Sequence, residues 1–400
     1  MRREGDLIKI NEWLLPLSCL YGLGVEFRNQ LFELGILKQR TFDIPVISVG
    51  NITVGGSGKT PHVEYLVRLL KDLAKVAVLS RGYKRKSRGY VLANDETTVA
   101  DLGDEPFQMK RKFPDIYVAV DKKRCEGITR LTTDEESKDV DVILLDDAFQ
   151  HRYVKPGINI LLVDYHRLII YDKLLPAGRL REPLKGKHRA DIVIVTKCPK
   201  DLKPMEYRVL TKAMNLFPYQ QLYFTSIDYD TPQRVFPAGN ATDAEQSKDK
   251  RQAPLSGKNV LLLTGIASPE QMQADLKRKC LSITPLFFSD HHLFKAKDLQ
   301  RITETFEAMP SPKMIITTEK DATRLKTLDN ISDNIKENLF MLPIKVRFML
   351  NEGENFNDKI ISYVQKNSRN SILVKRKDDH KSPDSHHSGN RTRTISFRDN

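Results

Sequence analysis

Short apolar runs alternate with stretches of helical periodicity over the first half of the chain. Five of these runs have the length and composition of buried strands, and they span 44–49, 75–80, 140–146, 158–164 and 191–197. Behind the first run, apolar residues recur at a spacing of three and four, which is typical of a helix with one buried face. Strands that alternate with helices form parallel sheets with crossover connections. We therefore expect an α/β unit with a mostly parallel sheet over residues 38–230.

The second half repeats this alternation on a smaller scale. Residues 231–257 are polar and lack apolar periodicity, which predicts a linker or a long loop. A smaller α/β unit is expected over 258–366, and its predicted elements are strands at 259–264, 282–288 and 314–318 and helices at 269–279 and 296–309. The polar tail, 367–400, is expected to be disordered.

The apolar residues ahead of the first strand predict a helical segment over 1–37. Its uninterrupted apolar part, Trp13 to Val25, is thirteen residues long, whereas a helix needs roughly 20 residues to span a bilayer. Acidic residues nearby and the lack of a small-residue cleavage site argue against a signal peptide. Two alternatives remain: a buried helical hairpin, or an amphipathic segment in a membrane interface with Trp13 and Tyr21 at headgroup depth.

The charge of the chain bounds the kind of partner it binds. A net charge of +13 favours nucleic acid, an anionic membrane face or phosphorylated small molecules, and does not choose among them. No segment resembles a nucleic-acid-binding module, so nucleic acid is not expected. The four cysteines are isolated in the sequence and form no C-x-x-C pair, so we expect reduced thiols rather than a disulfide or zinc framework.

A glycine-rich loop lies between the first predicted strand and the helix behind it. Its sequence, Val-Gly-Gly-Ser-Gly-Lys-Thr60, fits the phosphate-loop pattern, except that Thr53 stands where that pattern has its first glycine. In such a loop, backbone N–H groups converge on phosphate oxygens, the lysine reaches the β- and γ-phosphates, and the hydroxyl of the last residue binds Mg²⁺. The residues expected to bind a nucleotide are Gly55, Gly56, Ser57, Gly58, Lys59 and Thr60.

A second candidate site follows the strand predicted at 140–146. This strand ends in Asp146 and Asp147, and a phosphate-loop enzyme uses acids in such a position to hold Mg²⁺. We therefore expect Thr60, Asp146 and Asp147 to bind the metal ion.

Other polar loops follow the predicted strands, where ligands of open α/β sheets gather. A basic loop covers 81–88, and the sequence Gly103-Asp-Glu-Pro106 is expected to start a helix. In the second half, the loops Asp290-His-His292 and Thr318-Glu-Lys-Asp-Ala322 stand out. The histidine pair is weak support for a metal site, because no further ligand is nearby in the sequence.

Together these motifs resemble those of the tetraacyldisaccharide 4′-kinase family of lipid A biosynthesis. The resemblance runs from about residue 10 to about residue 350, and it includes the loops Ser80-Arg-Gly-Tyr83, Asp146-Asp-Ala-Phe-Gln-His151 and Leu175-Pro-Ala-Gly-Arg-Leu-Arg-Glu-Pro183. This family is similar in placing Ser or Thr at position 53. Its usual Asp-Asp-Gly is Asp146-Asp147-Ala148 here, which affects the shape of the loop and leaves the chemistry intact.

The resemblance implies a kinase that transfers the γ-phosphoryl group of ATP, with Mg²⁺, to the 4′-hydroxyl of a tetraacyldisaccharide 1-phosphate. Such an enzyme works at the cytoplasmic face of the bacterial inner membrane, so a peripheral contact with that surface is expected. The resemblance assigns the proton acceptor to Asp104, assisted by a histidine of Asp290-His291-His292, with His291 preferred over His292. On this resemblance, Lys59 is the catalytic cation. Weaker candidates for positioning roles are Gln150, Arg181, Glu182 and Lys197.

Two other classes of protein share some of these features. The glycine-rich loop also resembles those of nucleotide switches of the partitioning or metal-chaperone type, although the partitioning kind usually has a lysine where this chain has Val54. A nucleic-acid-dependent ATPase is supported only by the basic charge. The substance that stimulates ATP turnover discriminates among the three.

Overall fold

The computed structural model describes residues 10–236, 254–266, 269–289, 292–326, 328 and 330–368. Most of the predicted linker, the predicted tail from residue 369 onward, and His291 lie outside these ranges.

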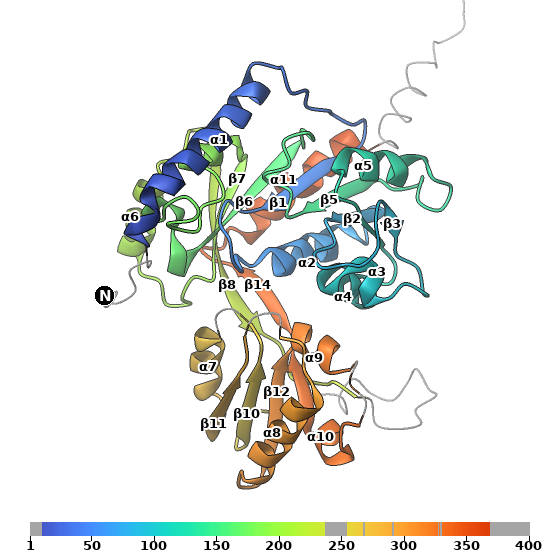
Figure 1. The fold of residues 1–400 in the computed structure, drawn as a ribbon, viewed down its shortest axis with the longest axis vertical. Coiled ribbons are helices and arrows are strands. Elements are labelled where there is room, and N and C mark those ends of the chain that lie inside the picture. The colour runs from blue at the N-terminus through green and yellow to red at the C-terminus, as the bar shows by residue number, and fades with distance from the viewer. Residues whose placement is uncertain are drawn as a thin grey trace, which may run out of the picture.

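The larger unit is built on a nine-stranded sheet with the order β14-β8-β7-β6-β1-β5-β2-β4-β3 (Figure 1). Neighbouring strands from β8 to β4 run parallel, while β14 and β3 pair antiparallel at the two edges. The strands are β1 (Val46–Gly50), β2 (Val76–Ser80), β3 (Val91–Leu92), β4 (Tyr117–Val120), β5 (Val142–Asp146), β6 (Ile158–Asp164), β7 (Ile192–Thr196), β8 (Gln221–Tyr229) and β14 (Ile344–Phe348). The expected mostly parallel α/β sheet is confirmed.

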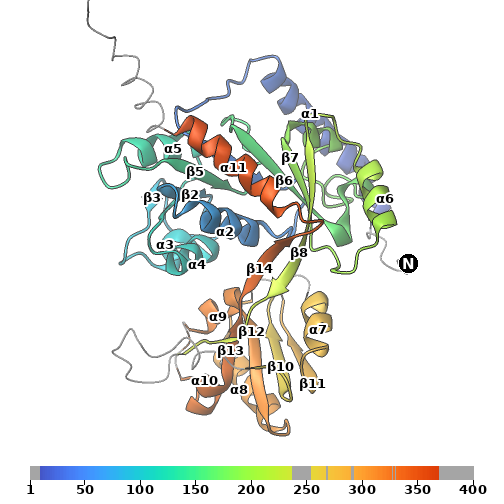
Figure 2. The same cartoon turned by 180° about the vertical axis from the view of Figure 1, so that it is seen from behind.

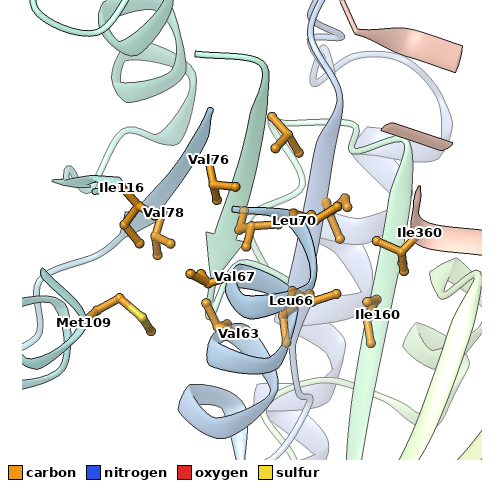
Figure 3. Packing of buried hydrophobic residues seen from close by; sticks show 14 of the residues in the cluster. Val63, Leu66, Val67, Leu70, Val76, Val78, Met109, Ile116, Ile160 and Ile360 are labelled. Carbon is orange, nitrogen blue, oxygen red and sulfur yellow. The ribbon is translucent and has the colours of Figure 1, made fainter. Parts of the chain in front are cut away.

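Helices cover both faces of this sheet. Apolar residues of α2 and α11 share one buried cluster with the sheet, in which Val63, Leu66 and Ile360 point toward the strands (Figure 3). Figure 2 shows α11 crossing that face. Residues of α5 and α6 belong to clusters on the other face. The helices of this unit are α2 (Lys59–Leu70), α3 (Val99–Leu102), α4 (Asp104–Lys112), α5 (Arg124–Thr133), α6 (Pro204–Met214) and α11 (Gly353–Asn367), and its short 3₁₀ helices are Tyr165–Arg167, Ile169–Tyr171 and Leu184–Arg189.

The smaller unit has a five-stranded sheet with the order β11-β10-β12-β13-β9. Its strands are β9 (Gln233–Arg234), β10 (Asn259–Thr264), β11 (Ser282–Phe287), β12 (Lys313–Thr318) and β13 (Leu339–Leu342). Its helices are α7 (Glu270–Lys277), α8 (Ala296–Glu307), α9 (Glu319–Leu325) and α10 (Asp333–Asn338). This is the second, smaller α/β sheet that the alternation predicted.

The boundaries of the two units differ from those expected. Strand β14 pairs with β8, and α11 packs on the larger sheet, so residues from Ile344 onward leave the smaller unit that was expected to extend to 366. Strand β9 pairs with β13, which places the start of the expected 231–257 linker in the smaller sheet. Strands β8 and β14 run together from the larger unit toward the smaller one in both views (Figures 1 and 2).

The N-terminal segment is a short 3₁₀ turn, Glu12–Leu14, followed by one long helix, α1 (Leu15–Glu33). The hairpin alternative is therefore wrong. Leu17, Leu20, Leu23 and Phe27 are exposed, and at 3.6 residues per turn they fall within about 120° of one another. Within the described residues, no helix is long and apolar enough to cross a bilayer.

Candidate active site

The glycine-rich loop leaves β1 and runs directly into α2, which begins at Lys59. Gly55 and Gly58 have φ angles of 119° and 83°, a region that residues with a side chain rarely adopt. The first N–H groups of α2 have no acceptor within the helix and carry its positive dipole end. The loop therefore has the geometry of an anion-binding site.

Asp146 lies beside this loop because β5 is the parallel neighbour of β1. Val49 at the end of β1 is in register with Asp146 at the end of β5. Its carboxylate accepts a hydrogen bond from the Ser80 hydroxyl at 3.3 Å, and the Arg124 guanidinium donates to its backbone carbonyl at 3.1 Å. Burial and the nearby carboxylates of Glu105 and Asp147 raise the pKa of Asp146 to about 7.

Asp147 is more exposed and lies between two cations. Its carboxylate oxygens are each 3.6 Å from a nitrogen, one from Lys59 Nζ and one from an Arg181 guanidinium nitrogen. Its φ angle of 50° is unusual for a residue with a side chain and turns the chain away from β5. Arg181 also donates to Gln150 at 3.3 Å, so two of the weaker candidates lie together at this site.

Asp104 begins α4, as the Gly-Asp-Glu-Pro sequence predicted. A side chain at Gly103 would come within 2.7 Å of the Tyr83 carbonyl, so the glycine allows the basic loop and the start of α4 to touch. The Asp104 carboxylate accepts hydrogen bonds of 2.8 and 3.3 Å from Arg324 of α9, in the smaller unit. Lys320 of the same helix lies 3.3 Å from Glu105. Asp104 therefore faces the smaller unit.

Asp290 and His291 lie outside the described residues, whereas Ser289 and His292 on either side of them are described. A side chain at Gly265 would contact Asp321 Oδ1 at 3.2 Å, the Ser289 carbonyl at 3.3 Å and His292 Cβ at 3.5 Å. Asp321 in turn accepts a hydrogen bond from Arg324 at 3.1 Å. Ser289, His292 and Asp321, the last of which binds Arg324, therefore all lie close to Gly265.

His292 has a local partner. Its Nε2 lies 2.9 Å from an Asp298 carboxylate oxygen at the start of α8, and its ring stacks on Phe288. Within the described ranges, no group of three or more His, Cys, Asp or Glu side chains has the arrangement of a metal site.

The remaining two candidates have different surroundings. Glu182 is buried and paired with Arg189 at 2.9 Å, an arrangement that stabilises its loop. Lys197 reaches the glycine-rich loop, where it donates to the Gly56 carbonyl, and it pairs with Asp164 at 2.7 Å.

Three residues at the site were given no role from the sequence: Ser80, which lies in the Ser80-Arg-Gly-Tyr83 motif, and Arg124 and Arg324. Ser80 ends β2, the other parallel neighbour of β5, so strand-end position alone was a signal for it. Arg324 follows Asp321 by one helical turn, which is a signal for a local ion pair but not for its bond to Asp104, 220 residues away. No sequence signal identified Arg124, because its hydrogen bond to the Asp146 carbonyl depends on which strands are neighbours in the sheet.

The site has the donors that a nucleotide and a divalent cation require. Among the described residues, the Ser57 hydroxyl and Asp146 Oδ1 are buried and have no hydrogen-bond partner. Buried polar atoms are rarely left unpaired, so both atoms are suited to a ligand. Hard oxygen donors such as these are what Mg²⁺ prefers.

Known proteins match this chain over most of its length. A family model described as tetraacyldisaccharide-1-P 4′-kinase matches residues 10–365. The chain is similar to the tetraacyldisaccharide 4′-kinase of Phocaeicola vulgatus, with 59% identity over 370 residues that cover 92% of this chain and 99% of that protein. It is also similar to the enzyme of that name from Bacteroides fragilis, with 52% identity over 381 residues that cover 95% and 100% of the two chains.

The fold is similar to a solved structure as well. A crystal structure of LpxK from Aquifex aeolicus, described as an "apo" form in complex with ATP, superposes with a TM-score of 0.65 at 30% identity. The alignment covers 88% of this chain and 98% of that one.

Proposed function

The chain belongs to the tetraacyldisaccharide-1-P 4′-kinase family, and we propose that it transfers the γ-phosphoryl group of ATP to the 4′-hydroxyl of a tetraacyldisaccharide 1-phosphate. The observation that carries this proposal is the full-length match, together with a phosphate loop in register with Asp146. The alternative, a nucleotide switch, is not supported, because the relatives that match almost from end to end are named kinases.

The residues of the loop neutralise and orient the phosphates. Phosphoryl transfer needs positive charge around the γ-phosphate and an aligned acceptor hydroxyl, and little covalent chemistry from the protein. The N–H groups at the start of α2 and the Lys59 ammonium supply this charge, with Gly55, Gly56, Ser57, Gly58 and Thr60 lining the phosphates.

Thr60, Asp146 and Asp147 are the residues proposed to hold Mg²⁺. The cation would offset the negative charge that develops on the phosphates during transfer. Asp146 has to be ionised for this role, and a bound cation would favour that ionised form over the protonated one.

Replacing either acid with asparagine keeps its shape and removes its charge. We expect Asp146→Asn and Asp147→Asn each to lower kcat by on the order of 100-fold and to raise the Mg²⁺ concentration needed for half-maximal rate. Asp115→Asn, at an exposed position on the same unit, is the matched control. Wild-type rates and Mg²⁺ dependence in both variants would remove these acids from the metal site.

Asp104 and His291 are proposed to act on the acceptor hydroxyl. A carboxylate next to an imidazole can share the proton that leaves the hydroxyl, provided that both reach it. The ion pairs from α4 to α9 support this proposal, because they hold Asp104 against the unit that carries His291.

The exposed face of α1 is proposed to dock on the cytoplasmic face of the inner membrane. Ser18 and Gly22 lie on the opposite side of the helix, where the Ser18 hydroxyl bonds the Leu174 carbonyl at 3.0 Å and the Ala177 N–H at 2.9 Å. One side of α1 is therefore fixed to the protein while the apolar side is open. An acylated substrate resides in a bilayer, and an interfacial helix brings the enzyme to it.

Replacing apolar residues on this face with polar ones should impair access to the lipid without impairing nucleotide binding. We expect the combined change of Leu20, Leu23 and Phe27 to Gln to weaken binding to anionic liposomes by on the order of 100-fold, because each side chain loses part of its transfer free energy. The KM for the lipid should rise more than the KM for ATP. The same change at the exposed Leu73, Leu281 and Leu293 is the control. Equal liposome binding by both triple variants would contradict the docking proposal.

The activity itself is tested by incubating the purified protein with radiolabelled ATP, Mg²⁺ and tetraacyldisaccharide 1-phosphate in detergent micelles. We expect label to appear in the lipid at the 4′-position. ATP hydrolysis that the disaccharide does not stimulate, with no labelled lipid, would contradict the proposed function.

A further inference from the structure

Three successive carbonyl groups of the glycine-rich loop accept hydrogen bonds from side chains outside the loop. Lys197 Nζ donates to the Gly56 carbonyl, and Thr196 Oγ1 donates to the Ser57 carbonyl at 2.9 Å. His62 Nδ1 lies 2.7 Å from the Gly58 carbonyl. The glycine-rich segment is thus anchored at every residue from Gly56 to Gly58.

These anchors determine the direction of the N–H groups. A trans peptide unit points its carbonyl and its N–H in opposite directions, so a fixed carbonyl fixes the N–H of the next residue. The Ser57 N–H bonds the Gly55 carbonyl within the loop at 3.0 Å. The anchored carbonyls of Ser57 and Gly58 therefore direct the N–H groups of Gly58 and Lys59 away from the anchors, at the positive end of α2.

The anchors are themselves held by the sheet. Thr196 is fully buried at the end of β7, and Lys197 pairs with Asp164 at the end of β6. His62 is buried on α2, and its Nε2 lies 3.1 Å from the Thr225 hydroxyl of β8. Because Nδ1 donates to a carbonyl, Nε2 of the neutral ring accepts from Thr225. The loop is therefore connected to three neighbouring strands.

We propose that His62, Thr196 and Lys197 are positioning residues that hold the phosphate loop in its nucleotide-binding shape before ATP arrives. Without them the glycine-rich loop samples many conformations, and ATP binding has to offset the loss of that freedom. Losing an anchor therefore lowers the affinity for ATP and leaves kcat nearly unchanged, since the loop regains its shape once ATP is bound. This inference rests on the proposed function only in taking ATP as the nucleotide.

Pairs of substitutions at two buried anchors separate hydrogen bonding from packing. Thr196→Val keeps the volume and removes the hydroxyl, whereas Thr196→Ser keeps the hydroxyl. His62→Leu removes the donor, whereas His62→Asn keeps a donor near the position of Nδ1. Lys197→Met and Lys197→Arg form a third pair at the most exposed of the three anchors, whose side chain is 19% exposed.

The dissociation constant of ATP is measured by calorimetry without lipid, alongside the KM values for ATP and lipid and the thermal midpoint. We expect Thr196→Val, His62→Leu and Lys197→Met each to weaken ATP binding about tenfold, as the loss of one hydrogen bond to the loop predicts. The KM for lipid and kcat at saturating ATP should change less than threefold. Thr196→Ser, His62→Asn and Lys197→Arg should restore most of the ATP affinity.

ATP affinity within twofold of wild type in the three donor-free variants would overturn the inference. If the buried variants do not fold, an unchanged affinity in Lys197→Met alone overturns it. A fall in kcat with unchanged ATP affinity would also overturn it. Normal ATP binding by the wild type without lipid phosphorylation would contradict the proposed function and leave this inference standing.

Discussion

Lys59→Ala is expected to lower kcat for phosphoryl transfer by on the order of 10³-fold while the protein stays folded. Lys59 begins α2, next to the glycine-rich loop, and its ammonium is the cation of that loop that reaches the β- and γ-phosphates in proteins with this motif. Without Lys59, its ammonium no longer neutralises the negative charge that develops on the phosphates in the transition state. Initial rates at saturating ATP and lipid measure the effect.

The stability of the protein should hardly change. Lys59 lies 3.6 Å from Asp147, which is one-third exposed, and a pair of this kind contributes about 1 kcal/mol or less. Lys71→Ala, at the other end of α2, removes the same charge far from the loop and is the matched control. A folded Lys59→Ala protein that retained near-normal turnover would rule out the kinase mechanism proposed for this loop.

The second large effect is expected at Asp104 and His291, which are 187 residues apart in the sequence. If the two side chains share the proton of the acceptor hydroxyl, each single change to alanine should lower kcat/KM by on the order of 100-fold or more. The double variant should then be little worse than the poorer single one, because residues that act as a unit are not additive. A double-mutant cycle on kcat/KM measures this coupling, and strictly multiplicative losses would show independent roles.

The bond between Asp104 and Arg324 supplies a control for this cycle. If Asp104 served only to bind Arg324, then Arg324→Met would be as harmful as Asp104→Asn. We expect Asp104→Asn to be the more harmful change, because it removes the proton acceptor, whereas Arg324→Met leaves that carboxylate in place. His292→Ala should have a smaller effect, since its ring binds Asp298. A fully active His291→Ala would move the role to His292 or remove the pair altogether.

The core of the larger unit was predictable because its signals are local. An apolar strand, a glycine-rich turn and an amphipathic helix follow one another directly, so β1, the loop and α2 lie where the periodicity placed them. The same holds for β5 and its terminal acids. Parallel pairing then brings Val49 and Asp146 to the same edge of the sheet.

The edges of the fold were not predictable in this way. Strand β14 has alternate exposed and buried residues, and its position beside β8 depends on a pairing between segments more than one hundred residues apart. A sequence pattern specifies which face of a strand is buried, but not which distant strand lies next to it. The same reason explains why the smaller unit was expected to extend to residue 366.

The sequence by itself was enough to predict the chemistry proposed for the nucleotide site, since the glycines, Lys59, Thr60 and the two acids belong to short motifs whose meaning depends on local backbone geometry. Only the tertiary structure decided what surrounds these motifs. It brought Arg324 to Asp104, placed one side of α1 in contact with the Leu174 loop and left the other exposed, and joined His62 to Thr225. Each of these contacts joins segments that are distant in the chain, and their proximity is a property of the packed sheet rather than of any short stretch of residues.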